Sequence, residues 1–371
     1  MPLPLERKTE VVIKLERLRK KMSERKIDAA RLSSIASTAW ITAGARLYVD
    51  ESTDRAASSI LITEDRAFIV TDSIEVTRLE QEEELGDLGF EFLVKPWYAE
   101  MDAAFSVLAN KQVGLEGISG TNTVDISADL RHLRSVLQEE EVLRLRRVSA
   151  LAAEAMYEAI QAVHPGMSEY EAAAKLAEAA RERGGSAVVN LIASDERIYR
   201  FRHPLPTDKR IEHYAMLVLC LRKEGLVPSI TRLVYFGSLP EDLHTRALAA
   251  ARVDARMILG TKPGRTMGSM FELARHAYQT EGYPEAIEEH HQGGSMGYNA
   301  REIIALPGDT TPIERYQAFA WNPSVRGVKS EDTILLGQHG PEVLTQQIAW
   351  PTWDITIDGK TIARPAILER N

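Results

Sequence analysis

The chain has 371 residues, of which 44% are hydrophobic and 27% charged, an ordinary globular composition that excludes a disordered or fibrous protein. Its length favours two domains with large cores. Because 54 acidic residues outnumber 45 basic ones and the net charge is −9, binding of nucleic acid phosphates is excluded as the main task. Apolar runs such as 215–221 are too short to span a bilayer, so no membrane role is expected.

The compartment is predicted from two further features. The first eight residues lack the apolar core of a signal peptide, and a single cysteine cannot form an internal disulfide. Both features favour the reducing cytoplasm.

The first 138 residues alternate helical and strand-like patterns. Apolar residues at helical spacing among Lys, Arg and Glu predict a surface helix over 11–26. Strands are predicted at 40–42, 58–62, 67–70 and 112–116, and helices at 76–84, 102–110 and 127–137. This alternation predicts a small α/β domain. The run from 138 to 147 starts acidic and turns basic, and we place the domain boundary between residues 138 and 139.

The second half begins with two helices and continues with strands. An Ala-rich helix runs to about Val163, and a second helix is capped by Ser168 and closed by Gly184 and Gly185. Strands are then predicted at 188–193, 215–221 and 233–236, helices at 242–259 and 270–280, and strands with turns over 318–357.

Several motifs stand in one order along this second half. They are F-R-H-P-L-P at 201–206, V-L-C-L-R-K-E-G-L-V-P-S-I-T-R at 218–232, H-H-Q-G-G-S-M-G-Y-N-A-R-E at 290–302, A-W-N-P at 320–323 and G-V-K-S-E-D-T at 327–333. In order and spacing they resemble the motifs of the creatinase/prolidase/aminopeptidase P family. The resemblance implies an α+β protein with a smaller α/β creatinase-like N-terminal domain, residues 1–138, and a C-terminal pita-bread catalytic domain, residues 139–371. It also implies a homodimer.

The chain departs from this family at the metal-ligand positions. Metal-dependent members bind two ions through two aspartates, a histidine and two glutamates. Here Val218, Ser229, Gly294 and Asn322 stand at four of these positions, and only Glu331 remains. Valine has no donor atom, and the lost carboxylates remove the negative charge that would hold two dications. We therefore expect no metal and no other cofactor.

Creatinase resembles this chain in keeping the fold without a catalytic metal. Its histidine acid and base corresponds to the region of His203, and an imidazole can take a proton from water and return it to a leaving nitrogen. The leading hypothesis is therefore a metal-independent, creatinase-like hydrolase that cleaves a C–N bond of a small amide, amidine or amino-acid derivative. Its catalytic residues would be His203, His290 and Glu331, and its substrate a small molecule or a dipeptide-like compound.

Further side chains are candidates for binding the substrate. They are Cys220, Ser229, Arg232, His291, Gln292, Arg301, Glu302 and Asn322. Adjacent residues in an extended segment face opposite sides, so only one of His290 and His291 is expected to line the pocket, and spacing favours His290.

The charged candidates have a structural alternative. Arg232, like Lys329, can bind a substrate carboxylate or neutralise Glu331 and Asp332, and the structural pair is favoured. Arg301 can likewise bind a carboxylate or pair with Glu302.

Cys220 shares a strand face with Val218, so its thiol is a candidate nucleophile beside a histidine. The competing interpretation is a small buried hydrophobic side chain, and it is the favoured one.

Two other functions stay open. The first is a metal-dependent Xaa-Pro-type dipeptidase or aminopeptidase with an unorthodox site, a single metal ion held by His290 or His291 with Glu331. The second is a catalytically inactive pita-bread protein that binds a small molecule, a peptide or a partner, as the loss of four ligand positions allows. Metal content and turnover distinguish the three hypotheses.

Overall fold

The computed structural model describes residues 4–99, 108 and 111–371, and the helix predicted at 102–110 lies outside these residues apart from residue 108. The chain forms two compact units, Met1–Glu141 and Val142–Asn371. In the described part of the chain, every helix is too short or too polar to cross a membrane.

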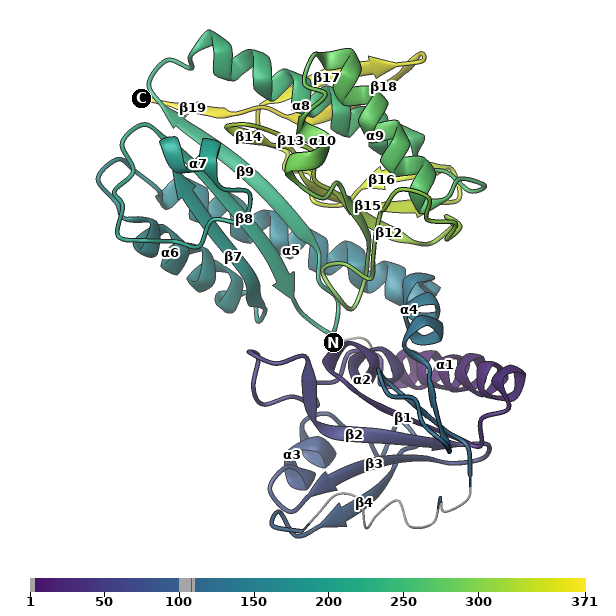
Figure 1. Cartoon of the computed structure of the whole chain (residues 1–371). Helices are drawn as coiled ribbons and strands as arrows, with labels where there is room; N and C mark the ends of the chain where they lie inside the picture. Colours follow the sequence, from purple (N-terminus) through teal and green to yellow (C-terminus); the bar gives the residue numbers. More distant parts are fainter. Residues whose placement is uncertain (1–3, 100–107, 109–110) are drawn as a thin grey trace. The chain divides into compact units, whose positions relative to one another are not determined.

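The first unit is an α/β domain built on one mixed sheet (Figure 1). The sheet has the order β4-β3-β2-β1-β5-β6, with β1 antiparallel to β2 and parallel to β5. Its strands are β1 (Ala29–Ser34), β2 (Arg55–Thr63), β3 (Ala67–Asp72), β4 (Glu91–Lys95), β5 (Val113–Leu115) and β6 (Thr123–Asp125). Its helices are α1 (Pro4–Arg25), α2 (Ile35–Ile41), α3 (Val76–Gln81) and α4 (Ser127–Ser135). The α/β expectation for this unit is confirmed.

One strand predicted in this unit is wrong. Residues 40–42 form the end of helix α2 and its C-cap at Thr42. The Ser34 side chain caps this helix by accepting a hydrogen bond from the Ser37 backbone N–H, and every residue of the helix is buried. A helix that is buried on all sides has no polar face, so its apolar residues show no helical period and resemble a buried strand.

The second unit contains two larger sheets. The first has the order β19-β9-β8-β7, and the second has the order β11-β10-β12-β15-β16. The first sheet contains β7 (Ser186–Ser194), β8 (Tyr214–Arg222), β9 (Ser229–Phe236) and β19 (Leu368–Arg370). The second contains β10 (Gly293–Met296), β11 (Ile303–Ile304), β12 (Ala318–Trp321), β15 (Asp332–Gly337) and β16 (Gly340–Val343). Two short hairpins are β13 (Ser324–Val325) with β14 (Val328–Lys329), and β17 (Thr352–Ile357) with β18 (Lys360–Pro365).

Helices cover both sides of these sheets (Figure 1). They are α5 (Glu139–Ala162), α6 (Glu169–Glu182), α7 (Glu196–Arg200), α8 (Glu241–Gly260), α9 (Met267–Glu281) and α10 (Ala286–Glu289). Ser168 caps α6 in a capping box with Glu171, which confirms the predicted helix start. The resulting α+β unit has the pita-bread architecture that the resemblance implied.

Strand β8 lies between two hydrophobic cores. Leu217 and Leu219 belong to the core that contains residues of α5 and α6, whereas Met216 and Val218 belong to the core that contains residues of α8, α9 and strands β12 and β15. A strand that is buried on both faces requires apolar residues at consecutive positions, which explains the uninterrupted run over 215–221. The same burial places Val218, at the family's first aspartate position, inside the core.

Candidate active site

His203 lies in the loop that follows α7, and the carboxylates of Glu169 and Asp195 hold the two ends of this loop. Glu169 is 0% exposed, forms an ion pair with Arg197 and accepts hydrogen bonds from the Thr207 backbone N–H at 3.0 Å and hydroxyl at 2.8 Å. Asp195 accepts backbone N–H bonds from residues 212, 213 and 214, each at 2.9 Å. Several hydrogen bonds therefore restrict the position of the exposed His203 ring.

His290 and His291 connect α10 to β10. The Gln292 amide group donates to the His290 carbonyl and accepts a hydrogen bond at 2.7 Å from the hydroxyl of the buried Tyr278. The rings of His290 and His291 stack with their centroids 4.4 Å apart. The expectation that they face opposite sides is therefore wrong, because the two residues precede the strand and do not follow its alternation.

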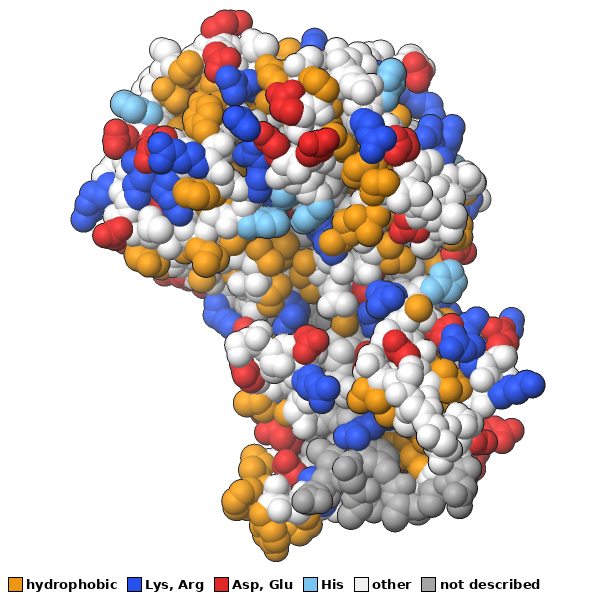
Figure 2. All heavy atoms as spheres, viewed as in Figure 1, with side chains coloured by type: hydrophobic (Ala, Val, Ile, Leu, Met, Phe, Trp, Pro, Cys, Tyr) orange, Lys and Arg blue, Asp and Glu red, His pale blue; other side chains and the backbone are white. Residues whose placement is uncertain are grey.

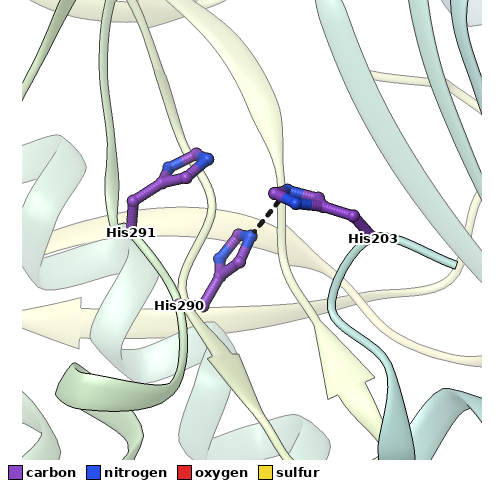
Figure 3. Close-up of side chains that lie close together, drawn as sticks. All are labelled: His203, His290 and His291. Atoms are coloured by element: carbon purple, nitrogen blue, oxygen red, sulfur yellow. Dashed lines mark hydrogen bonds between the residues drawn. The ribbon is translucent and has the colours of Figure 1, made fainter.

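Three imidazole rings converge at this point (Figure 3). His203 Nε2 and His290 Nε2 are 3.1 Å apart, and the His203 and His291 ring centroids are 5.6 Å apart. One ligand atom from each ring lies within 4.8 Å of the others. The tertiary structure thus joins residues 87 positions apart in the sequence into one cluster.

All three rings are held in the neutral form. Burial and the Lys329 charge lower the pKa of His290 to about 2, and burial and the Arg301 charge lower the pKa of His291 to about 4. Burial and Lys329 also lower the pKa of His203. A neutral imidazole has one unprotonated nitrogen that can bind a metal ion, but rings with pKa values as low as those of His290 and His291 are weak bases toward water.

Glu331 lies beside this cluster but has strong partners of its own. Its carboxylate contacts Arg301 at 2.7 Å and Lys329 at 2.8 Å, and it accepts the Thr231 hydroxyl at 2.6 Å. Burial opposes its ionisation, but the charges of Lys329 and Arg301 hold the pKa of Glu331 well below its usual range. A backbone bridge between Thr231 and Glu331 joins β9 to the segment before β15 and fixes this arrangement.

The charges near the histidines sum to a positive value. Arg301 and Lys329 share the single carboxylate of Glu331, and Arg202 and Arg326 share that of Glu289 directly before His290. In Figure 2, histidine side chains reach the surface of the larger unit next to arginine or lysine side chains. Such a surface attracts an anionic group of a ligand.

Cys220 lies behind the site and is 5% exposed. Its thiol contacts the Ser229 hydroxyl at 3.2 Å, and burial together with the Glu331 charge raises the pKa of Cys220. A neutral buried thiol is a poor nucleophile.

We therefore expect native Cys220 to react with a thiol reagent at pH 7 at least ~100-fold more slowly than after unfolding, because the reagent needs an accessible thiolate. The rate of colour release by a chromogenic disulfide, with and without denaturant, measures this. Fast labelling of the folded protein, or loss of turnover in Cys220→Ser, would favour the nucleophile hypothesis instead.

The remaining candidates have mainly structural contacts. Arg232 pairs with Asp332 at 2.8 Å, as expected for the structural alternative. Glu302 accepts backbone N–H bonds from the turn at residues 298 and 299. Ser229 accepts a hydrogen bond from Arg301 at 3.2 Å, and Asn322 has a buried side-chain oxygen without a partner among the described residues.

Sequence reasoning did not single out Glu169 or Asp195, which hold the His203 loop. Glu169 has the sequence signature of an ordinary acidic residue in the first turn of a helix, and Asp195 stands in no motif. Only the loop that packs against them reveals their role.

The two metal ions that the family resemblance implies do not fit these residues. Val218 offers no donor, Glu331 is neutralised by two cations, and Gly294 has no room for a side chain. A Cβ atom at Gly294 would lie 1.9 Å from the carbonyl oxygen of Ile303 on the neighbouring strand. The family's metal-binding histidine therefore cannot occupy this position in the present backbone.

Gly294→Ala is expected to lower the free energy of unfolding by about 3 kcal/mol or more, because the backbone of two paired strands must separate. Urea denaturation measures the loss. Gly337→Ala is the matched control, because its Cβ would meet nothing closer than 3.7 Å. Equal stability of the two variants would contradict the close approach of the Gly294 and Ile303 backbones.

Comparison with known proteins identifies the family. The sequence model of metallopeptidase family M24 matches residues 144–338, and that of the creatinase/prolidase N-terminal domain matches residues 14–148. The chain therefore belongs to metallopeptidase family M24 and has the creatinase/prolidase type of N-terminal domain. Hydrolases that cleave peptides define this class.

Individual relatives are distant but similar over nearly their whole length. A Xaa-Pro dipeptidase from Pyrococcus furiosus is 23% identical over 90% of this chain and 97% of its own. The crystal structure of the prolidase from Pyrococcus horikoshii OT3 superposes with a TM-score of 0.77 at 22% identity, covering 90% of this chain and 98% of that one. A Xaa-Pro dipeptidase from Bacillus anthracis gives the same TM-score at 21% identity, covering 97% and 100%. At these identities the structures establish the fold.

Proposed function

We propose that this protein hydrolyses the amide bond of a dipeptide-like substrate, as a Xaa-Pro-type dipeptidase whose active site differs from that of its family. The convergence of His203, His290 and His291 is the observation that supports this most strongly. Amide hydrolysis requires a group that activates a water molecule, and a neutral imidazole can do so as a base or by binding a metal ion. Membership in family M24 and the prolidase-like fold support the substrate class.

Different residues of the chain would activate water and bind the substrate. His203 takes a proton from a water molecule as the water attacks the amide carbonyl carbon. The C–N bond then breaks, and the leaving nitrogen takes up the proton that His203 accepted from water. Arg301 and Lys329 lie beside the histidines with one carboxylate between them, and the buried Nε of Arg301 has no partner among the described residues. These cations would bind the carboxylate of a dipeptide and so orient its amide bond.

The test is an assay of amino-acid release from Xaa-Pro dipeptides, dipeptides without proline and N-acyl amino acids, with and without added Zn²⁺, Co²⁺ or Mn²⁺. We expect hydrolysis of at least one dipeptide class. We also expect the C-terminal amide of that substrate to show a KM at least ~10-fold higher, because it lacks the charge that the cations bind. No turnover under any of these conditions would contradict the proposed function and favour the binding-protein hypothesis.

A further inference from the structure

We propose that His203, His290 and His291 form a binding site for one transition metal ion, and that this site replaces the two-metal centre of the family. The site uses none of the residues at the family's ligand positions. A catalytic role of the site rests on the proposed hydrolase function, because a bound ion would activate water there. Its occupancy can be tested without a substrate.

The donor atoms determine the kind of metal ion. Sites rich in carboxylates and water favour Mn²⁺ or Mg²⁺, whereas imidazole nitrogen suits Zn²⁺, Cu²⁺, Ni²⁺ and Co²⁺. The described part of the cluster offers nitrogen from three rings, and the nearby carboxylate of Glu331 is bound to Arg301 and Lys329. The proposed ion is therefore of the zinc class, with an open position for water or substrate on the side of the exposed His203.

The geometry of the cluster is close to that of a metal site. Two imidazole nitrogens on one tetrahedral Zn²⁺, each at about 2.0–2.1 Å, are separated by about 3.3 Å. His203 Nε2 and His290 Nε2 are already 3.1 Å apart, and each of the three rings offers one nitrogen within 4.8 Å of a nitrogen of the others. An ion can take the place of the proton that these two nitrogens share in the metal-free protein.

Binding requires a small rearrangement of His291. Its Nδ1 accepts the Gly293 backbone N–H at 3.2 Å, and this contact must be given up if Nε2 binds a metal ion and Nδ1 carries the proton. A rotation of the ring about the Cβ–Cγ bond achieves this. Because the hydrogen bond is long, the rotation sacrifices little stability.

The neighbouring cations reduce the affinity and so provide a specific test. The Lys329 charge acts on all three rings, and the Arg301 charge acts on His203 and His291. Replacing Lys329 by Met removes one of these charges and leaves Glu331 paired with Arg301. The Lys329→Met variant is expected to bind Zn²⁺ about 10-fold more tightly, an effect that a purely structural lysine would not produce.

The main experiment titrates the full chain, stripped with a chelator, with Zn²⁺ by calorimetry and with Co²⁺ by visible absorption. We expect one ion per chain and the intense absorption of Co²⁺ with four ligands. His203→Ala, His290→Ala and His291→Ala should each lower the affinity at least ~100-fold. The exposed His276 on α9 lies outside the cluster, so His276→Ala is the matched control and should bind as the unchanged protein does.

The outcomes separate this inference from the proposed function. Absence of stoichiometric binding, or equal binding by the cluster variants and the control, would overturn the metal site even if the metal-free protein hydrolyses dipeptides. Stoichiometric binding that depends on all three histidines would support the site even if no substrate is turned over. Thermal melting of each variant checks its fold, and His203→Ala is informative by itself because His203 is exposed.

Discussion

His203→Ala is expected to lower kcat/KM for a dipeptide substrate by about 10³-fold, because either a general base or a metal ligand for water activation is lost. His203 is exposed, so truncation of its ring leaves no buried cavity, and the melting temperature should stay nearly unchanged. Steady-state kinetics and thermal melting of the same preparation measure both effects.

The control for this variant is again His276→Ala, which removes a histidine that is exposed on α9. It should retain full activity. If His203→Ala remains within ~10-fold of the unchanged protein, the ring neither activates water nor binds a metal ion, and the chemistry must be assigned to other residues.

Glu331→Ala is expected to lower the free energy of unfolding by about 3–5 kcal/mol, because it leaves the buried charges of Arg301 and Lys329 without their partner. Glu331 is 1% exposed and contacts both cations within 2.8 Å. Urea denaturation at neutral pH measures the loss. Removing Lys329 as well, in Lys329→Met/Glu331→Ala, should restore part of it, because one uncompensated charge disappears.

The matched control is an ion pair on the surface of the same unit. Glu342 pairs with Arg146 at 2.7 Å, but both side chains are about half exposed. Glu342→Ala should therefore change the stability by less than ~1 kcal/mol. Similar losses in the two alanine variants would show that the Glu331 pairs behave like surface pairs and that the site is well hydrated.

Most of the fold was predictable from local sequence signals. The apolar run over 215–221 predicted strand β8, and the cap at Ser168 predicted the start of α6. Helix α2 was not recognised, because complete burial removed the polar face by which a helix is identified. Local patterns succeed where an uninterrupted apolar run has the length of a strand, or where a capping residue marks the end of a helix.

The sequence predicted which residues belong to the candidate site better than it predicted how their side chains lie relative to one another. His203, His290 and His291 were all named from motifs, but the strand rule placed the last two on opposite sides, whereas their rings stack. Arg301 was assigned to a substrate or to Glu302, whereas its guanidinium contacts Glu331. Such pairings join residues from separate elements, and their distances depend on how the loops pack.

The sequence by itself determined the architecture of the family and predicted that four of the five metal-ligand residues are replaced, because both inferences depend only on residue types in a fixed order. The tertiary structure decided how the candidate side chains are arranged. It brings three neutral imidazoles together, commits Glu331 to Arg301 and Lys329, and closes the space at Gly294 against Ile303. These facts arise from a loop held by the carboxylates of Glu169 and Asp195 and from the close approach of two strands, which no local pattern encodes.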